Sequence, residues 1–156
     1  MSEIGKESII EQLKEKGLKI TPQRLAIVNA LVKLRRLHPG ARLVYEEAKR
    51  KKERLSLSTV YATLNELSRH AIIRTLQFDK MENRYEGNLE EHINLICERC
   101  HRIVDYRAPI AVDKREVEKS TGFSIADTRL EYYGCCRECS ETREAREARH
   151  LEHSPD

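Results

Sequence analysis

The stretch that decides the fold is Ser56-Leu-Ser-Thr-Val-Tyr-Ala-Thr-Leu-Asn-Glu-Leu-Ser-Arg69. Its apolar residues recur at the spacing of one helical face: Val60, Leu64 and Leu67. Either Ser56 or Ser58 can cap the first turn, because a serine oxygen accepts from the free backbone N–H groups there. The stretch therefore predicts an amphipathic helix, whose other face carries polar side chains such as Tyr61 and Asn65.

Three helices are expected before this one. The first is indicated by a helical stripe between Ile9 and Leu18, with Gly17 as its stop. The second begins at the cap Thr21, because proline at the first helical position loses no hydrogen bond, and it ends at the pair His38-Pro39. The third is expected over Ala41–Arg54.

Two short extended runs follow the fourth helix, at Ile72–Phe78 and Arg84–Glu86. Residues 79–83 between them are polar, which is typical of a hairpin turn. Helices followed by a β-hairpin indicate a winged helix-turn-helix domain over residues 1–87.

The pattern changes after a polar hinge at residues 87–91. Strands are expected at Asn94–Cys97, Ile103–Tyr106 and Phe123–Tyr133, with a helix near Val112–Ser120. We therefore expect an α+β protein, in which residues 92–145 form a small α/β domain. Residues 146–156 are expected to be a frayed tail.

Composition narrows the function classes. A chain of 156 residues is too short for a large catalytic barrel, and it contains neither a leader sequence nor a membrane-length apolar run, so we expect it in the cytoplasm. Residues 1–85 hold 18 basic and 10 acidic side chains, a net charge of +8, whereas residues 86–156 hold 11 and 16, a net charge of −5. This asymmetry indicates a polyanion partner for the first half or an unevenly charged solvated surface.

The cysteines carry the strongest chemical signal. Cys97 and Cys100 form one C-x2-C pair, Cys136 and Cys139 form another, and 35 residues (101–135) separate them. Two such pairs complete the tetrahedral four-thiolate shell that structural zinc prefers. The alternative roles for these cysteines are a redox-active pair or simple packing. Cys135 is expected to be a free thiol rather than a fifth ligand.

Several motifs occur in the order seen in the ferric uptake regulator (Fur) superfamily. They are Thr21-Pro-Gln-Arg24, His38-Pro39, Ser58-Thr-Val-Tyr-Ala-Thr-Leu-Asn65, His92-x-Asn-Leu-Ile-Cys-Glu-Arg-Cys100, Ile103-Val-Asp105 and Tyr133-Gly-Cys-Cys-Arg-Glu-Cys139. The match runs over about residues 8–140, and the chain most resembles the peroxide-sensing PerR branch.

The resemblance implies a homodimeric, metal-dependent repressor that binds a near-palindromic operator in double-stranded DNA. The N-terminal domain would bind DNA, and the C-terminal domain would form the dimer. The four-cysteine zinc would be structural. A regulatory Fe(II) or Mn(II) ion would lie between the domains, and its implied ligands are His38, Glu86, His92, Asn94 and Asp105. With Fe(II), peroxide would oxidise His38 or His92 and release the DNA.

Two regulatory positions depart from the resembled pattern. Asn94 stands where most members have a third histidine, and its amide oxygen is a harder donor than imidazole. Glu86 resembles the iron sensors, whereas Asp105 fits the peroxide branch. An iron-uptake or zinc-uptake regulator is therefore the alternative within the family. We assign no role to His101, which replaces a common glycine.

The helix of the opening stretch would be the recognition helix in the major groove. Its expected DNA contacts are Ser58, Thr59, Tyr61 and Asn65, and Arg24 would neutralise phosphate. The run Lys49–Lys52 either contacts phosphate or forms a solvated face.

An enzyme is the main alternative class, as a zinc hydrolase or a zinc-stapled thiol redox enzyme. The sequence lacks a phosphate-binding glycine loop and a His-Glu-x-x-His helix, and four-thiolate zinc leaves no position for a substrate water. A zinc-stapled adaptor that binds only protein is a third class, and the positive charge of the N-terminal half argues against it. We therefore expect a regulator and no enzyme activity.

Overall fold

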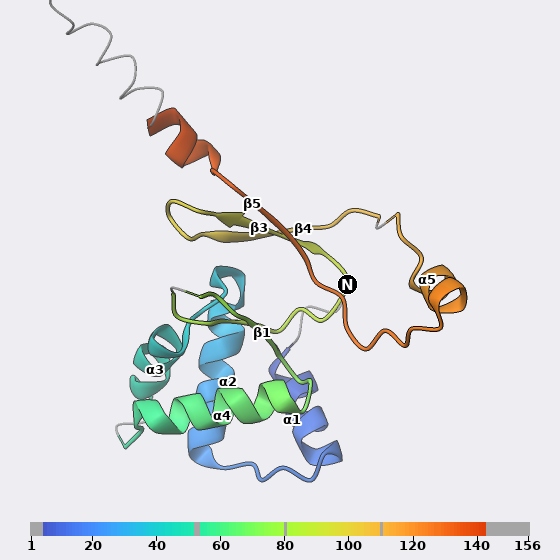
Figure 1. The fold of residues 1–156 in the computed structure, drawn as a ribbon. Helices are drawn as coiled ribbons and strands as arrows, with labels where there is room; N and C mark the ends of the chain where they lie inside the picture. Colours follow the sequence, from blue (N-terminus) through green and yellow to red (C-terminus); the bar gives the residue numbers. More distant parts are fainter. Residues whose placement is uncertain (1–4, 52–53, 80, 110, 143–156) are drawn as a thin grey trace, which may run out of the picture. The chain divides into compact units, whose positions relative to one another are not determined.

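The computed structural model describes residues 5–51, 54–79, 81–109 and 111–142. It divides the chain into two compact units, Met1–Glu90 and Glu91–Asp156, hereafter unit 1 and unit 2. Figure 1 shows helices in unit 1 and a sheet in unit 2. The predicted α+β class is confirmed. The expected frayed tail lies outside the described residues, and no described helix is long and apolar enough to cross a membrane.

Unit 1 opens with two helices, α1 (Lys6–Glu15) and α2 (Pro22–Leu34), and a short 3-10 helix, η1 (Arg35–Leu37). The expected cap of α2 is present, because the Thr21 hydroxyl accepts from the Arg24 N–H at 3.2 Å and Pro22 occupies the first turn. The start of α2 that the sequence predicts is thus the one that forms.

Two more helices, α3 (Ala41–Lys49) and α4 (Leu57–Arg69), complete the helical part of unit 1. Ser56 rather than Ser58 caps α4, since its hydroxyl accepts from the Thr59 N–H at 3.1 Å. The expected extent of α3 to Arg54 is wrong. Between Ala48 and Leu55 the sequence has no apolar residue to continue the buried stripe, and crowded like charges oppose further helical turns.

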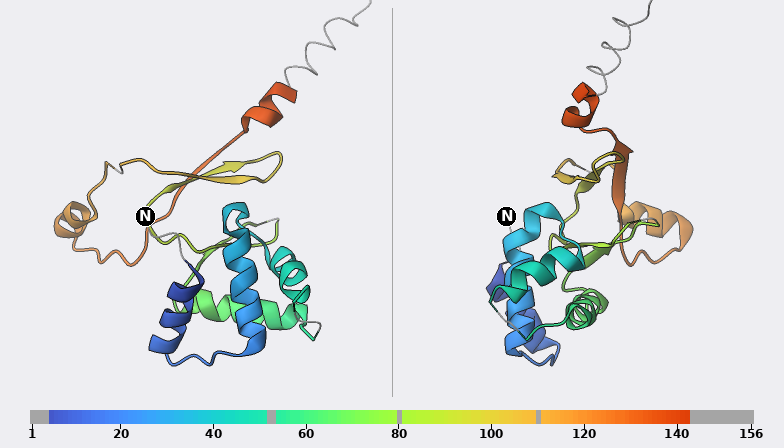
Figure 2. Two further views of the ribbon diagram at one scale, coloured as in Figure 1. Left: turned by 180° about the vertical axis from the view of Figure 1, so that it is seen from behind. Right: turned by 90° about the vertical axis from the view of Figure 1, so that its left-hand side faces the viewer.

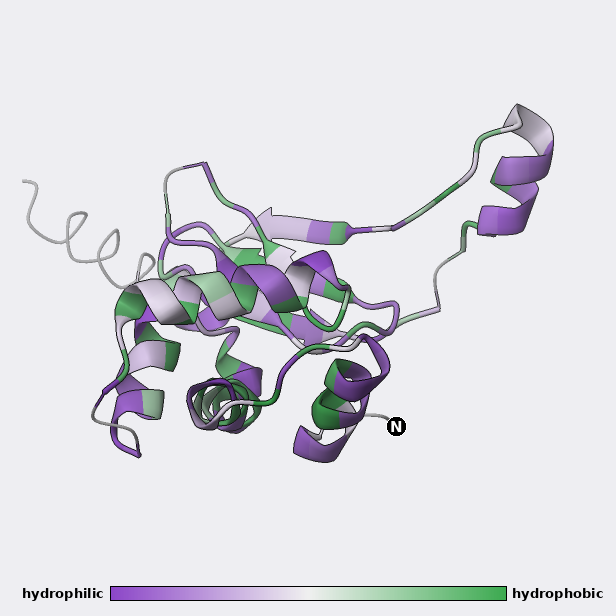
Figure 3. Ribbon diagram, turned by 90° about the horizontal axis from the view of Figure 1, so that it is seen from below, coloured by the Kyte–Doolittle hydropathy of each residue, from purple (hydrophilic) through white to green (hydrophobic). Residues whose placement is uncertain are grey.

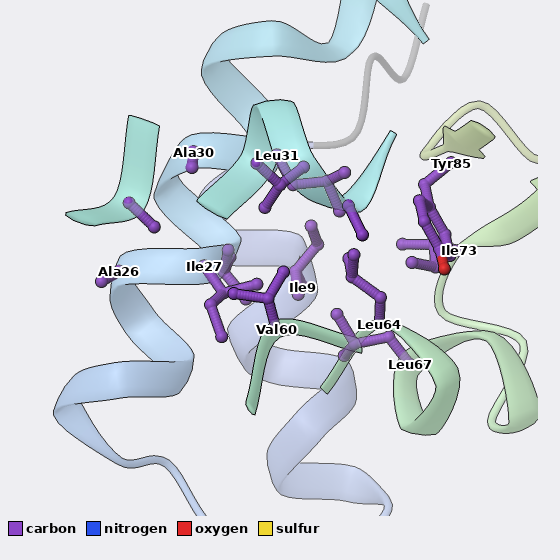
Figure 4. Packing of buried hydrophobic residues seen from close by; sticks show 14 of the residues in the cluster. Ile9, Ala26, Ile27, Ala30, Leu31, Val60, Leu64, Leu67, Ile73 and Tyr85 are labelled. Carbon is purple, nitrogen blue, oxygen red and sulfur yellow. The ribbon is translucent and has the colours of Figure 1, made fainter. Parts of the chain in front are cut away.

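The four helices enclose one apolar core. Figure 4 shows side chains from α1, α2 and α4 meeting there, together with Ile73 and Tyr85 from beyond the helices. Ile27, Val60 and Leu64 are fully buried, and Val60 and Leu64 belong to the predicted apolar face of α4. Burial of these side chains fixes which face of α4 points outward.

A two-stranded hairpin closes unit 1. Strands β1 (Arg74–Leu76) and β2 (Arg84–Glu86) pair antiparallel, and Thr75 lies opposite Tyr85. The run expected from Ile72 to Phe78 forms a strand only over Arg74–Leu76. Ile72 and Ile73 instead pack into the helical core, so their backbone leads into the hairpin rather than extending it.

Unit 2 is a three-stranded sheet of β3 (Ile93–Cys97), β4 (Ile103–Tyr106) and β5 (Leu130–Gly134), in the order β4-β3-β5. Strand β3 pairs antiparallel with β4 and parallel with β5. The expected strand from Phe123 is wrong in its first part, because β3 offers only five residues for pairing and all five already face β5.

Helix α5 (Lys114–Thr121) lies in the connection between β4 and β5. It begins later than expected because the Asp113 carboxylate caps it, accepting from the Arg115 N–H at 2.9 Å. None of its side chains is buried, and the ribbon of this helix in Figure 3 has mainly the colour of hydrophilic residues. Figure 2 shows the helix apart from the strands of unit 2.

The cap of α4 gives a first testable prediction. Replacing Ser56 with alanine (Ser56→Ala) removes the acceptor for the Thr59 N–H and should lower the free energy of unfolding by about 1 kcal/mol. Urea unfolding followed by circular dichroism measures the change. The matched control is Ser58→Ala, an exposed residue that does not cap, and a loss from Ser58→Ala as large as that from Ser56→Ala would contradict the assignment.

Candidate functional site

Four cysteines meet at one end of the unit 2 sheet. Cys97 ends β3, Cys100 lies in the turn that follows, and Cys136 and Cys139 come directly after β5. The parallel pairing of Cys97 with Gly134 delivers the second pair to the first. All four sulfur atoms lie within 4.8 Å of one another, so the sheet brings together every predicted zinc ligand.

Backbone geometry shapes the first cysteine turn. The His101 N–H donates to the Cys97 carbonyl at 2.9 Å, and the Cys97 N–H donates to the Arg102 carbonyl at 3.0 Å. His101 has a φ of 59°, a left-handed conformation that permits this reversal. Sequence reasoning gave His101 no role, and the structure gives it one in the turn.

A bidentate ion pair joins the two cysteine turns. The Arg102 guanidinium donates to both Glu138 carboxylate oxygens at 2.8 Å, and Arg99 donates to the Cys139 carbonyl at 3.1 Å. Sequence reasoning missed these contacts, because their residues are charged positions with no distinctive spacing. They tie the turn that carries Cys97 and Cys100 to the segment that carries Cys136 and Cys139.

The electrostatics of the cluster favour a cation. The backbone N–H groups of Cys100 and Cys136 lower the pKa of Cys97 to about 5, whereas the adjacent Cys136 thiol raises the pKa of Cys139 to about 12. Four thiolates this close repel one another, so all four ionise together only around a positive ion. The sulfur-only donor set and its compactness fit tetrahedral zinc.

Cys135 lies outside this cluster. Its side chain is exposed, and the group of possible metal ligands includes its neighbour Cys136 but not Cys135 itself. The two adjacent cysteines therefore differ in environment, and Cys135 is a natural control for the role of Cys136.

Unit 1 carries two of the predicted regulatory ligands, His38 and Glu86, and brings them together. Their candidate ligand atoms lie within 4.8 Å of each other, and both side chains are buried. The cause is a backbone contact, since the Pro39 carbonyl accepts from the Tyr85 N–H at 2.9 Å. His38 has a φ of 45°, a left-handed conformation that histidine adopts more readily than most residues.

Unit 2 carries the other three. His92 immediately precedes β3, and Asn94, two residues later on that strand, pairs in register with Asp105 on β4. The His92 Nε2 atom lies 4.0 Å from Asp105 Oδ1. Asn94 is 4% exposed, and its Oδ1 atom has no hydrogen-bond partner among the described residues. A buried oxygen of this kind, beside an imidazole and a carboxylate, fits a metal ligand.

The outward face of α4 carries the predicted DNA contacts. Ser58 and Asn65 are exposed, and Ala62 and Arg69 continue the same face. Thr59 is half-buried, and its hydroxyl is bonded to Ser56 at 2.8 Å. The exposed face is therefore polar with one small residue at its centre, a surface that can enter a groove of DNA.

Tyr61 differs from the rest of that face, because its hydroxyl donates to a Glu82 carboxylate oxygen at 3.3 Å. Glu82 was missed by sequence reasoning, where it was one of several polar residues in an expected turn. Its position becomes informative only once the hairpin is placed beside α3 and α4.

The expected phosphate ligand Arg24 is engaged within unit 1. Its guanidinium forms an ion pair with Glu66 on α4 and donates to the Lys19 carbonyl at 2.6 Å. The neighbouring Gln23 donates to the Arg54 carbonyl at 2.7 Å. The Thr-Pro-Gln-Arg motif therefore joins the start of α2 to the connection between α3 and α4 and to the C-terminal part of α4.

The four-sulfur cluster gives a second prediction. Cys136→Ser leaves three thiolates, and we expect it to lose zinc and the folded form of unit 2 together, because structural zinc contributes directly to folding. Metal analysis and thermal unfolding measure both losses. Cys135→Ser is the matched control and should keep its zinc, so a zinc-free Cys136→Ser protein that unfolds like wild type would contradict the assignment.

Comparison with known proteins agrees with this geometry. The profile of the Ferric uptake regulator family matches residues 15–133. The Peroxide operon regulator of Bacillus subtilis (strain 168) is 37% identical over 133 residues, which cover 84% of this chain and 90% of that protein. The Peroxide-responsive repressor PerR of Staphylococcus aureus (strain Mu50 / ATCC 700699) is 32% identical over 134 residues, which cover 85% and 90%.

Solved structures agree as well. The Helicobacter pylori ferric uptake regulator Fur, described with three functional metal binding sites, has a TM-score of 0.71 at 28% identity, covering 87% of this chain and 94% of that one. The Francisella tularensis ferric uptake regulator with iron has a TM-score of 0.66 at 28% identity, covering 80% and 96%. These relatives are regulators rather than enzymes. The sequence, the four-sulfur cluster and these matches together show that the chain belongs to the ferric uptake regulator family.

Proposed function

We propose that this protein is a metal-dependent DNA-binding transcriptional repressor that responds to peroxide. The observation that carries the proposal is the presence of two chemically different ligand sets, one of four thiols and one of imidazole, carboxylate and amide groups. The first set suits a permanent structural zinc, and the second suits a reversible Fe(II) or Mn(II) ion. Its similarity to two peroxide regulators supports the peroxide signal.

The regulatory ion would be held by ligands from both units. We propose that it binds His38 and Glu86 of unit 1 and His92, Asn94 and Asp105 of unit 2. An ion with ligands in two units stabilises only conformations that bring all of them to it, so metal binding selects one arrangement of the units. DNA affinity and metal affinity are then coupled, and each raises the other by the same factor.

Peroxide would end repression by changing a ligand. A bound Fe(II) ion supplies the chemistry that activates hydrogen peroxide. The imidazole of His38 or His92 gains one oxygen atom from the peroxide in place of a ring hydrogen, and the remaining atoms leave as one water. The oxidised ring binds metal poorly, so the ligand set is broken and the DNA is released.

Unit 1 would read the DNA with α4. We propose that Ser58, Thr59, Tyr61 and Asn65 lie in the major groove, where asparagine can bind adenine through two hydrogen bonds. Because Arg24 is already paired with Glu66, its main contribution would be to hold α4, with any phosphate contact secondary. The target is double-stranded DNA, and the protein would act in the cytoplasm.

Unit 2 would form a homodimer, which implies a near-palindromic operator. Large apolar side chains are exposed on this unit: Val104, Tyr106, Val112, Phe123, Tyr132 and Tyr133. A second copy that covers them would remove apolar area from water, which stabilises association.

A metal-uptake regulator of the same family is the second candidate. Asn94 and Glu86 favour this second candidate. With an amide oxygen and a glutamate carboxylate, the ligand set contains more hard oxygen donors than imidazoles. Such a regulator would bind DNA according to metal supply and would keep its histidines intact in peroxide.

One experiment separates the two candidates. Zinc-loaded protein is given Fe(II) or Mn(II) without oxygen, and binding to a DNA duplex that it selects from a random library is measured before and after stoichiometric peroxide. We expect only the iron sample to lose DNA binding and to gain about 16 daltons at His38 or His92 by mass spectrometry. Persistent binding with unmodified histidines would favour the metal-uptake regulator.

A variant tests the regulatory site itself. His92→Ala removes an imidazole that is not part of the four-cysteine cluster, so it should keep the zinc and the fold but lose the metal dependence of DNA binding. Metal analysis, circular dichroism and DNA binding with and without Mn(II) measure these properties. His70→Ala is the control histidine variant, because His70 belongs to neither group of candidate metal ligands, and an unchanged metal response in His92→Ala would remove His92 from the site.

A further inference from the structure

Glu82 completes the N-terminus of α3. The cap residue there is Gly40, which offers no side-chain acceptor. The Glu82 carboxylate reaches it from the β1–β2 connection and accepts from the Arg42 N–H at 3.0 Å. A negative charge at this end of a helix is stabilised by the helix dipole. A Cβ atom at Gly40 would collide with the carboxylate in its present position, so the carboxylate lies directly against the backbone of the cap residue.

The same oxygen of Glu82 also accepts from α4. It lies 3.3 Å from the Tyr61 hydroxyl, on the helix proposed to read DNA. Partial burial and the negative charge of Glu82 raise the pKa of Tyr61, so the phenol stays protonated and donates. A hydroxyl that donates to Glu82 turns its lone pairs and its ring, rather than its proton, toward any other partner.

The segments that Glu82 joins also carry the regulatory ligands of unit 1. Gly40 is two residues after His38, and Glu82 is four residues before Glu86. The Gly40–Arg84 bridge and the hydrogen bond from Tyr85 to Pro39 hold these segments side by side. Glu82 thus contacts Tyr61 directly. It also contacts the segment that follows His38, and it lies in the connection that leads to Glu86.

We propose that Glu82 is a positioning residue of the DNA-reading surface, which fixes the Tyr61 phenol on α4 relative to the segments that bear His38 and Glu86. This inference rests on the proposed function of α4 in DNA recognition. It assigns Glu82 a role in sequence discrimination, whereas a simple helix cap would affect only the stability of unit 1.

The experiment measures discrimination in the full-length, zinc-loaded protein with Mn(II). The probes are the duplex that wild-type protein selects from a random library and a scrambled duplex of the same composition. Dissociation constants for both are measured for wild type, Glu82→Ala, Tyr61→Phe and the double variant. We expect each single variant to reduce the ratio of the two affinities by about tenfold, and the double variant to lose no more than either one.

Two further variants show whether the effect of Glu82 comes from positioning Tyr61, from its negative charge or from the folding of unit 1. Glu82→Gln keeps an acceptor oxygen for Arg42 and Tyr61, so it should retain most of the discrimination. Asp79→Ala removes an exposed carboxylate from the same connection and should leave the ratio unchanged. Thermal unfolding of every variant shows whether unit 1 is folded under the binding conditions.

Several outcomes would overturn the inference. Glu82→Ala could keep the wild-type ratio of the two affinities. Alternatively, the reductions caused by Glu82→Ala and Tyr61→Phe could add fully in the double variant. Either result would show that Glu82 does not act through the phenol. An equal loss in Asp79→Ala would assign the effect to charge alone. A wild-type protein that enriches no DNA sequence would instead refute the proposed function, and the inference with it.

Discussion

The crowding of four thiols at one end of a small sheet is the constraint on which unit 2 depends. Among its described residues the buried apolar side chains are few: Ile93, Ile96, Cys97 and Ile103. A core of that size cannot offset the entropy lost on ordering the chain. Zinc would supply the missing free energy, because it binds the folded arrangement of sulfurs and has no comparable site in the unfolded chain. The parallel pairing of β3 with β5 makes that arrangement possible.

Unit 1 is stabilised in a different way, and the difference bears on function. Its helices share a fully buried core, so the outward face of α4 is held rigidly without a metal. The proposed regulatory ligands His38 and Glu86 lie outside this core cluster, on a left-handed residue after η1 and on the last residue of β2. An ion proposed at these residues would therefore not be needed to fold unit 1.

Glu82 ties the hairpin to two helices of unit 1. The hairpin is a short two-stranded ladder, and such ladders are weak by themselves. It packs on the helices through Tyr85 and the Gly40–Arg84 bridge, and the Glu82 carboxylate adds contacts to the start of α3 and to α4. Glu82 lies in the connection before the strand that carries Glu86, so its carboxylate links that segment to Tyr61.

The sequence by itself determined the start of α2, the apolar face of α4 and the two cysteine pairs that meet in one cluster, because caps, helical periodicity and C-x2-C pairs are local patterns. It placed the end of α3 and the start of the last strand wrongly, since those depend on what packs or pairs beside them. The environment of Asn94, the turn at His101, the engagement of Arg24 by Glu66 and the contacts of Glu82 were decided only by tertiary structure. Each depends on residues far apart in the chain, whose proximity no local pattern encodes.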